Sequence, residues 1–326
     1  MKRIYIAGIL CFFVIGSLAA KSGFSQTIRE EKLEKPASWK ASNSVAVFSG
    51  YDNNVNLSTD RKGDIFQEIL LSLNFSKRLK GRCYLTIDYD IDALNYHEVS
   101  NASYILNHLR LGLHKRFSTL RIGTGYDLGA AFYPNWGNNN FLLHKGFLYL
   151  GNYLTDSIYH QLQAEIGLKD YTDRKALHDT ISTYQDKKRS QDRLSIEYSL
   201  RASIRPKLIW GIKVRLLTND SNDRYLDYYD YDSHRIMPFA EYSLTEKVNL
   251  FADFSIARKT YKSRTLVTDS TWKQKDKVYT YRIGTRYKLS QGDSFILHYT
   301  YRNNDTSELL EKYTESIISV GWRHNF

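Results

Sequence analysis

The sequence predicts an all-β fold: a transmembrane, up-and-down antiparallel β-barrel of about fourteen strands, with twelve or sixteen strands as alternatives. Three observations support this prediction. The chain begins with a segment typical of secretion signals. The rest alternates polar and apolar residues in strand-length segments, and long and short connections between those segments alternate strictly.

Residues 1–25 have the order of a secretory signal peptide. Two basic residues precede an apolar run from Ile4 to Ile15, and small and polar residues follow. The run is shorter than the roughly 20 residues that a membrane helix needs, so it is typical of a cleaved signal. We place cleavage after Ser25, with cleavage after Ala20 as the alternative.

The composition is that of a chain held by backbone pairing rather than by disulfides. The whole sequence has 26 Tyr, 15 Phe and 5 Trp against 4 Pro and 2 Met. Cleavage would leave 43 Lys and Arg against 35 Asp and Glu, a net charge of +8, and a single cysteine, Cys83. One cysteine forms no internal disulfide. We expect a short periplasmic segment over 26–42 and a barrel over 43–326.

A period of two residues marks strands with two unlike faces. Leu109, Leu111 and Leu113, for example, alternate with His108, Arg110, Gly112 and His114. The predicted strands cover approximately residues 43–52, 64–77, 82–92, 103–116, 119–129, 142–153, 158–171, 191–204, 208–219, 231–243, 247–260, 275–289, 294–303 and 313–326.

The connections indicate the topology. Short ones lie at 79–81, 117–118, 155–157, 205–207, 245–246 and 291–293, and long polar ones cover about 53–63, 93–102, 130–141, 172–190, 220–230, 261–274 and 304–312. Outer-membrane barrels have short periplasmic turns and longer outside loops. We therefore expect the chain in the outer membrane of a Gram-negative bacterium, with the long loops outside and both termini in the periplasm.

The apolar face of each strand would meet lipid, and the polar face would line the lumen. The candidate lumen-lining residues are Asp88, Asp90, Arg110, Arg121, Glu197, Arg201, Lys213, Arg215, Arg282, Arg286 and Arg302. Fourteen strands spaced about 4.8 Å apart and tilted by about 40° give a backbone diameter of roughly 28 Å, of which inward arginines would leave roughly 10–15 Å. Such a lumen either conducts or is closed by ion pairs.

The end of the chain resembles the C-terminal signal by which bacterial outer-membrane barrels are recognised for insertion. Val320, Trp322 and Phe326 lie at alternate positions back from the terminus, with His324 in place of the usual apolar residue. The resemblance implies the barrel assembly machinery as a partner.

Three stretches resemble a narrower group. Ser49–Leu57, Asn219–Tyr231 and Asn303–Phe326 are similar to the barrel of surface lipoprotein assembly modifiers and of related barrels in exopolysaccharide export. The resemblance implies fourteen strands, an export role and a periplasmic export partner. The modifiers also carry a periplasmic tetratricopeptide domain ahead of the barrel, and residues 26–42 are too few to form one.

The sequence contains no Walker loop, Gly-x-Ser-x-Gly, His-Glu-x-x-His or paired-cysteine motif. We therefore expect no enzyme, no cofactor and no metal site. We expect outer-membrane lipid and lipopolysaccharide as partners, and no nucleic acid. Two functions are open. The first is a transport or export channel, for a small or anionic solute or as the exit of a polysaccharide or surface-protein pathway. The second is a structural or binding barrel with a closed lumen that acts through its surface loops.

The terminal signal can be tested by deleting Phe326 or by adding a charged residue after it. Either change should lower the amount of assembled barrel, because it removes or displaces the terminal apolar residue of the last strand. The measurement is the fraction of heat-modifiable protein in the outer-membrane fraction on gels. Unchanged assembly would contradict the proposed signal.

Overall fold

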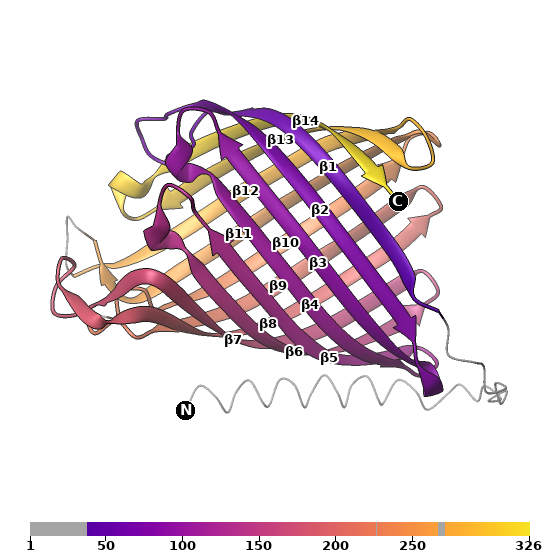
Figure 1. The fold of residues 1–326 in the computed structure, drawn as a ribbon, viewed down its shortest axis with the longest axis horizontal. Coiled ribbons are helices and arrows are strands. Elements are labelled where there is room, and N and C mark those ends of the chain that lie inside the picture. Colours follow the sequence, from indigo (N-terminus) through magenta and orange to yellow (C-terminus); the bar gives the residue numbers. More distant parts are fainter. Residues whose placement is uncertain (1–37, 226, 267–270) are drawn as a thin grey trace. The chain divides into compact units, whose positions relative to one another are not determined.

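The structure, a computed structural model, describes residues 38–225, 227–266 and 271–326. Within these residues, fourteen strands pair in sequence order, each antiparallel to its neighbours, and the first strand pairs with the last (Figure 1). The sheet is therefore a closed barrel. The prediction of a fourteen-stranded, up-and-down antiparallel barrel is confirmed.

The strands are β1 (Lys40–Asp52), β2 (Asp64–Arg78), β3 (Cys83–Tyr96), β4 (Tyr104–Arg116), β5 (Leu120–Phe132), β6 (Phe141–Thr155), β7 (Ile158–Leu177), β8 (Tyr184–Arg205), β9 (Leu208–Ser221), β10 (Tyr231–Ser243), β11 (Val248–Thr265), β12 (Lys273–Lys288), β13 (Asp293–Thr306) and β14 (Tyr313–Asn325). Short 3-10 turns lie in the connections: η1 (Lys80–Arg82), η2 (Ser100–Ala102), η3 (Gly137–Asn139) and η4 (Leu309–Glu311). None of the helices in the described ranges is long and apolar enough to span a membrane.

The two ends of the barrel differ in their connections. At one end, here called the short-turn end, the even-numbered strands β2 to β12 pass to the next strand through brief turns such as 206–207. At the other, the long-loop end, the connections include 53–63, 133–140 and 222–230. Figure 1 shows the larger loops and hairpins together at one end, with the C-terminus at the other.

The predicted loop over 172–190 is largely wrong. β7 and β8 continue through it as a hairpin, with Lys175 paired to Lys188 and Leu177 to Tyr184. The register shifts after Asp170, and such bulges interrupt the period of two on which the prediction depended. β1 also begins at Lys40, three residues earlier than predicted. Residues 1–37, which include the predicted signal peptide, lie outside the described part.

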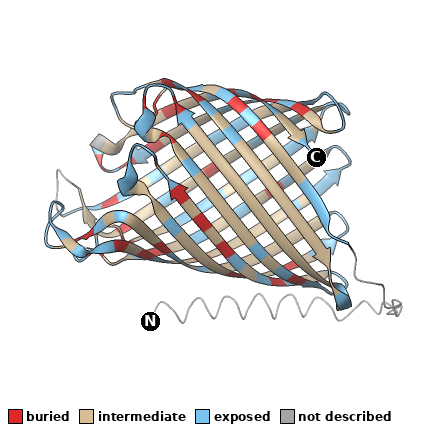
Figure 2. Ribbon diagram, viewed as in Figure 1, coloured by how far each residue is buried: buried red, intermediate tan, exposed pale blue. Residues whose placement is uncertain are grey.

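The outward face of the barrel is apolar across its middle. Leu148, Ile166 and Ile283 are 53%, 69% and 57% exposed. Figure 2 shows exposed positions spread among less exposed ones on several strands, whereas β3 is intermediate along nearly its whole length. A belt of exposed large apolar side chains is unstable in water and suits contact with lipid.

The inward face holds glycines that aromatic rings cover. A Cβ atom on Gly211 would lie 2.4 Å from Phe239, and one on Gly321 would lie 2.2 Å from Phe48, closer than real contacts allow. The same holds for five other pairs: Gly50 with Phe66, Gly123 with Tyr149, Gly125 with Phe147, Gly151 with Tyr159, and Gly284 with Phe251. Because glycine has no side chain, each ring can lie against the backbone of the neighbouring strand and leave more of the lumen free.

Gly125→Ala should destabilise the barrel, whereas Gly129→Ala on the same face of β5 should not. The new Cβ at 125 would lie 2.0 Å from the Leu111 carbonyl oxygen and 2.5 Å from the Phe147 ring, but at 129 the nearest atom is 3.5 Å away. Overpacking of this kind costs about 1–3 kcal/mol. Urea unfolding in lipid vesicles, followed by gel mobility, measures the difference. Equal stability of the two variants would contradict close contact between Phe147 and Gly125.

Candidate functional site: the lumen

The strand register places all the predicted lumen-lining residues on the inward face. Asp88 pairs with Arg110, Glu197 with Arg215, and Lys213 with Met237. The full set on this face is Asp88, Asp90, Arg110, Arg121, Glu197, Arg201, Lys213, Arg215, Arg282, Arg286 and Arg302. The C-terminal residues Val320 and Trp322 point outward, and Phe326 is 60% exposed.

Charge is distributed unevenly around the lumen. In a closed barrel of fourteen strands, β3 and β10 lie opposite each other. The wall of β1 to β3 carries the inward carboxylates Asp52, Glu68, Asp88, Asp90 and Asp92. The wall of β8 to β12 is mainly basic, with Arg193, Arg201, Lys213, Arg215, Arg235, Lys259, Arg282 and Arg286 on its inward face. An electric field therefore points across the lumen from the basic wall to the acidic wall.

Between these walls, β3 to β6 carry a chain of paired charges. Asp127, which is 2% exposed, accepts a hydrogen bond at 2.5 Å from His108 Nε2. Its other oxygen lies 2.9 Å from Lys145 Nζ. His108 also lies 3.7 Å from Asp90. A buried carboxylate with two such partners stiffens the wall and leaves little free charge there.

A second network joins β7, β8 and β9. Glu165 Oε2 accepts hydrogen bonds from Arg215 at 3.0 Å and from Ser195 at 3.1 Å. Its other oxygen accepts one from Gln163 at 2.7 Å. Arg110 reaches the same group from β4, since its guanidinium lies 4.1 Å from the centre of the Phe147 ring and 3.4 Å from Gln163. Arg215 and Arg110 are thus engaged within the wall.

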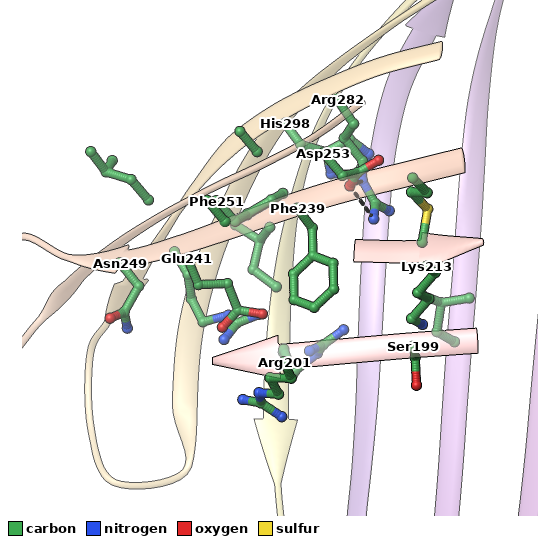
Figure 3. A pocket seen from close by; sticks show the side chains of 18 of the residues that line it. Ser199, Arg201, Lys213, Phe239, Glu241, Asn249, Phe251, Asp253, Arg282 and His298 are labelled. Carbon is green, nitrogen blue, oxygen red and sulfur yellow. Dashed lines mark hydrogen bonds and ion pairs between the residues drawn. The ribbon is translucent and has the colours of Figure 1, made fainter. Parts of the chain in front are cut away.

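A cavity of about 690 Å³ lies inside the barrel, against the basic wall (Figure 3). Its basic lining residues are Arg201, Lys213, Arg282, Arg286 and Arg323, and its acidic ones are Glu68, Glu241 and Asp253. Arg282 donates to Asp253 Oδ2 from Nε at 2.7 Å, and its Nη2 lies 2.6 Å from the same oxygen. This pair neutralises one cation of the cavity.

In the part of the chain that the structure describes, the other cations of the cavity are unpaired. Arg201, Lys213, Arg286 and Arg323 have no carboxylate within 4.0 Å in the described ranges. The Nε atoms of Arg286 and Arg323 are buried and have no hydrogen-bond partner there. Unpaired guanidinium groups that line a cavity present donors to any anion that enters it.

The cavity also has an apolar part, which the polar-lumen prediction missed. Phe48, Leu70, Met237, Phe239, Phe251 and Ile296 line it. Figure 3 shows Phe239 and Phe251 close to Arg282 and Glu241. The period of two could have found these rings, since Phe251 lies between Asn249 and Asp253 at inward positions.

At the long-loop end, part of the lumen is filled. Val55 and Val99, from two different loops, pack on Phe66 and Tyr96 of the inward face. The Tyr96 hydroxyl donates to Asp52 at 2.9 Å. Loop side chains therefore cover the rim above β1 to β3.

Cations stack on aromatic rings at the rest of this rim. Lys169 Nζ lies 3.7 Å from the centre of the Phe141 ring, Arg189 lies 3.6 Å from that of Tyr229, and Lys259 lies 4.1 Å from that of Tyr231. Arg189 is 1% exposed and lies 3.4 Å from Asp223. The contacts of Arg189 with Tyr229 and Asp223 fix the β7–β8 hairpin on the loop between β9 and β10.

We searched the described residues for side chains that could bind a metal ion together. No three His, Cys, Asp or Glu side chains among them are grouped so that they could hold a metal ion. His108 and His114 face the lumen from β4 and His298 faces it from β13, whereas His144 and His160 face outward.

No protein-family model and no curated protein matches the sequence. Several solved structures match the fold. The trimer form of OmpT, an outer membrane protein of Vibrio cholerae, is 11% identical over 89% of this chain and 99% of its own, with a TM-score of 0.53. An anion-selective porin from Comamonas acidovorans is 10% identical over 89% and 99%, with a TM-score of 0.51. The CymD monoaromatic hydrocarbon channel is 9% identical over 88% of each chain, with a TM-score of 0.50.

At these identities the likeness is one of fold. It does not extend to the narrower resemblance to surface lipoprotein assembly modifiers. The chain has the fold of outer-membrane β-barrels.

Proposed function

We propose that this chain is a channel of the Gram-negative outer membrane and that a small anionic solute passes through its lumen. The observation that carries the proposal is the cavity lined by four cations that lack a carboxylate partner in the described part of the chain. Fixed positive charge in a narrow aqueous space raises the local concentration of anions. An anion-selective porin shares the fold, so this architecture can support the proposed activity.

The cavity lining favours anions that also have an apolar part. Phe239 and Phe251 line the same cavity as the unpaired cations Arg201, Lys213 and Arg286. A carboxylate or phosphate group would be drawn to the guanidinium groups, and an aromatic or alkyl part would lose water against the rings. Aryl and alkyl carboxylates are therefore the solutes that we would test first.

We propose no catalytic role. Ser319 Oγ lies 2.9 Å from His298 Nε2, which is the spacing of a nucleophile and its base. Ser319 is only 2% exposed, however, and no carboxylate in the described ranges contacts His298 to orient its ring. A substrate therefore has no access to the pair. The pair also lacks the carboxylate of a catalytic triad among the described residues.

Conductance in planar bilayers tests the proposal. Purified protein should conduct and should favour chloride over potassium. A triple variant, Arg201→Gln with Lys213→Gln and Arg286→Gln, should lose this preference, because substitutions in the lumen tune selectivity with little effect on assembly. Benzoate should reduce the chloride current of the wild type more than that of the variant.

A matched control removes three cations outside the cavity: Lys115→Gln, Lys187→Gln and Lys188→Gln. This control should keep the anion preference of the wild type. Cation preference in the wild type would contradict the proposal and would assign control of selectivity to Asp88 and Asp90. An anion preference that survives the cavity variant would show that other charges set it.

A specific observation favours a second function, a binding or structural barrel with a closed lumen. Val55 and Val99 pack into the rim above β1 to β3, and the β7–β8 hairpin is fixed on its neighbouring loop. In this case the wild type would show no conductance, and its loops would be the working surface. Conductance that appears only when residues 55–62 are replaced by a short Gly-Ser link would identify the loop over 53–63 as the closure.

The export function that the sequence resemblance implies is a third form of the proposal. In that form the lumen would be the exit of a polysaccharide or surface-protein pathway and would need a periplasmic partner. Co-purification of such a partner with the barrel, together with loss of the exported polymer in a deletion strain, would support it.

A further inference from the structure

The outward face of the barrel is basic in one region of the long-loop end. On β12, Lys273, Lys275 and Lys277 alternate outward, and all three are exposed. Arg258 of β11 pairs directly with Lys277 and is exposed on the same face. Four cations therefore lie together above the apolar belt on two neighbouring strands.

The loop over 53–63 adds a fifth cation and fixes it in place. Arg61 Nη2 donates to Thr314 Oγ1 on the outward face of β14 at 2.7 Å. Asn54, which is fully buried, donates to the Ser58 carbonyl at 2.9 Å and to the Thr314 carbonyl at 2.8 Å. Arg61 has a φ of 37°, a conformation that a non-glycine residue adopts when its surroundings impose it. The loop is thus anchored against the outside of the barrel.

Between this loop and the strands lies a notch of about 590 Å³. Arg61, Lys312, Tyr279 and the hydroxyl residues Ser58, Thr59 and Thr314 line it. Lys312 lies 3.3 Å from Asp305, the acidic residue of the lining. Lys277 stands beside the notch, with its Nζ 4.9 Å from the centre of the Tyr279 ring. The notch therefore offers cations and hydroxyl donors to an anionic group.

The notch lies at the upper edge of the apolar belt. Below Tyr279 on the same face of β12 come Tyr281 and Ile283, which are 46% and 57% exposed. On β13, Tyr299 and Leu297 continue the belt at 39% and 47% exposure. Tyrosines flank the hydrocarbon layer of membrane barrels where lipid headgroups begin. A group in the notch would thus sit at headgroup depth, with lipid-facing side chains directly below it.

The cluster on β11 and β12 differs from the other side of this end. The outward face of β7 to β10 carries the acidic residues Asp170, Asp192, Asp220 and Asp232, and the exposed cations there, such as Lys175 and Lys187, lie beyond them on the β7–β8 hairpin. On β2, β4 and β5 the outward face ends instead in Ile65, Ile105 and Phe132. A general electrostatic attraction between the barrel and an anionic membrane surface would not require the strand-borne cations to gather on β11 and β12.

We infer that the notch binds the phosphate groups of an outer-leaflet glycolipid, lipopolysaccharide, whose acyl chains lie along the apolar face of β12 and β13. Arg61, Lys312 and Lys277 hold the phosphates, and the hydroxyl residues donate to sugar or phosphate oxygens. The site is independent of the lumen and of the proposed channel function. A soluble anion would gain the charge contacts alone, and a lipid also gains the apolar contacts below the notch.

The test uses the full-length mature barrel, refolded in detergent without lipopolysaccharide and titrated with it. Binding is followed by intrinsic tryptophan fluorescence and by native mass spectrometry. The wild type should bind phosphorylated lipopolysaccharide, with affinity that falls as salt rises. The variant Arg61→Gln, Lys277→Gln, Lys312→Gln should bind it roughly tenfold more weakly or worse, since charge-assisted contacts to phosphate are lost. The wild type should bind enzymatically dephosphorylated lipopolysaccharide with an affinity reduced by a similar factor.

The control variant, Lys175→Gln with Lys187→Gln and Lys188→Gln, removes three exposed cations from the β7–β8 hairpin at the same end. Its affinity should equal that of the wild type. Heat-modifiable mobility of all variants shows whether the barrel is intact. Wild-type affinity in the Arg61 variant, or no binding by the wild type, would overturn the inference. Inorganic pyrophosphate that binds the wild type as tightly as lipopolysaccharide would show a soluble-anion site in place of a lipid site.

Discussion

The structure depends on the pairing of β1 with β14. Each backbone amide and carbonyl within a hydrocarbon layer needs a partner in the protein, because no water is available there and an unpaired group costs several kcal/mol. Strands in the middle of a sheet find partners on both sides, but the first and last strands do so only if the sheet closes. Register pairs from Ser44 with Asn325 to Asp52 with Ile317 provide this closure. The ends of the described barrel, far apart in sequence, are thereby fixed side by side.

Closure also determines what each side chain can contact. Since successive residues of a strand point to opposite faces, one register divides the barrel into an outside and an inside. It further places β3 opposite β10, so that carboxylates such as Asp88 and Asp90 face a mainly basic wall across the lumen. Within each wall, neighbouring strands bring opposite charges together, as with Asp127 and Lys145 or Glu165 and Arg215. Arg286 and Arg323 remain unpaired in the described ranges, because the residues directly across from them on the adjacent strands are not carboxylates.

Space inside the barrel is governed by glycine and aromatic residues together. A ring on one strand covers a glycine on the next, as Phe251 covers Gly284, so large side chains occupy the wall and leave part of the lumen open. At the long-loop end the opposite occurs, because Val55 and Val99 bury Phe66 and Tyr96 and loop residues fill the rim. The cavity therefore lies below a partly covered mouth, an arrangement that suits either selective passage or closure.

The sequence by itself predicted about fourteen strands, with twelve or sixteen as alternatives, the strict alternation of long and short connections, and the face on which each candidate lumen residue lies. These features are local: a period of two residues is set by the pleat of a single strand, and it can be read without knowing the strand's neighbours. The period failed where bulges interrupt it, as after Asp170 in the β7–β8 hairpin. The same period of two places Phe239 and Phe251 on the inward face. They were not predicted to line the lumen because we expected its lining to be polar.

Only the tertiary structure decided which charges are paired and where free ones gather. Arg282 and Asp253 meet because β11 and β12 pair in one register, while Arg286, four residues from Arg282, has no such partner in the described ranges. The contact between Arg61 and Thr314 joins residues 253 positions apart and brings a loop onto the outer face of the last strand. Such contacts depend on closure, on register and on the path of a loop. These are properties of the whole barrel, because a strand's own pattern fixes the direction of a side chain but not its partner across the sheet.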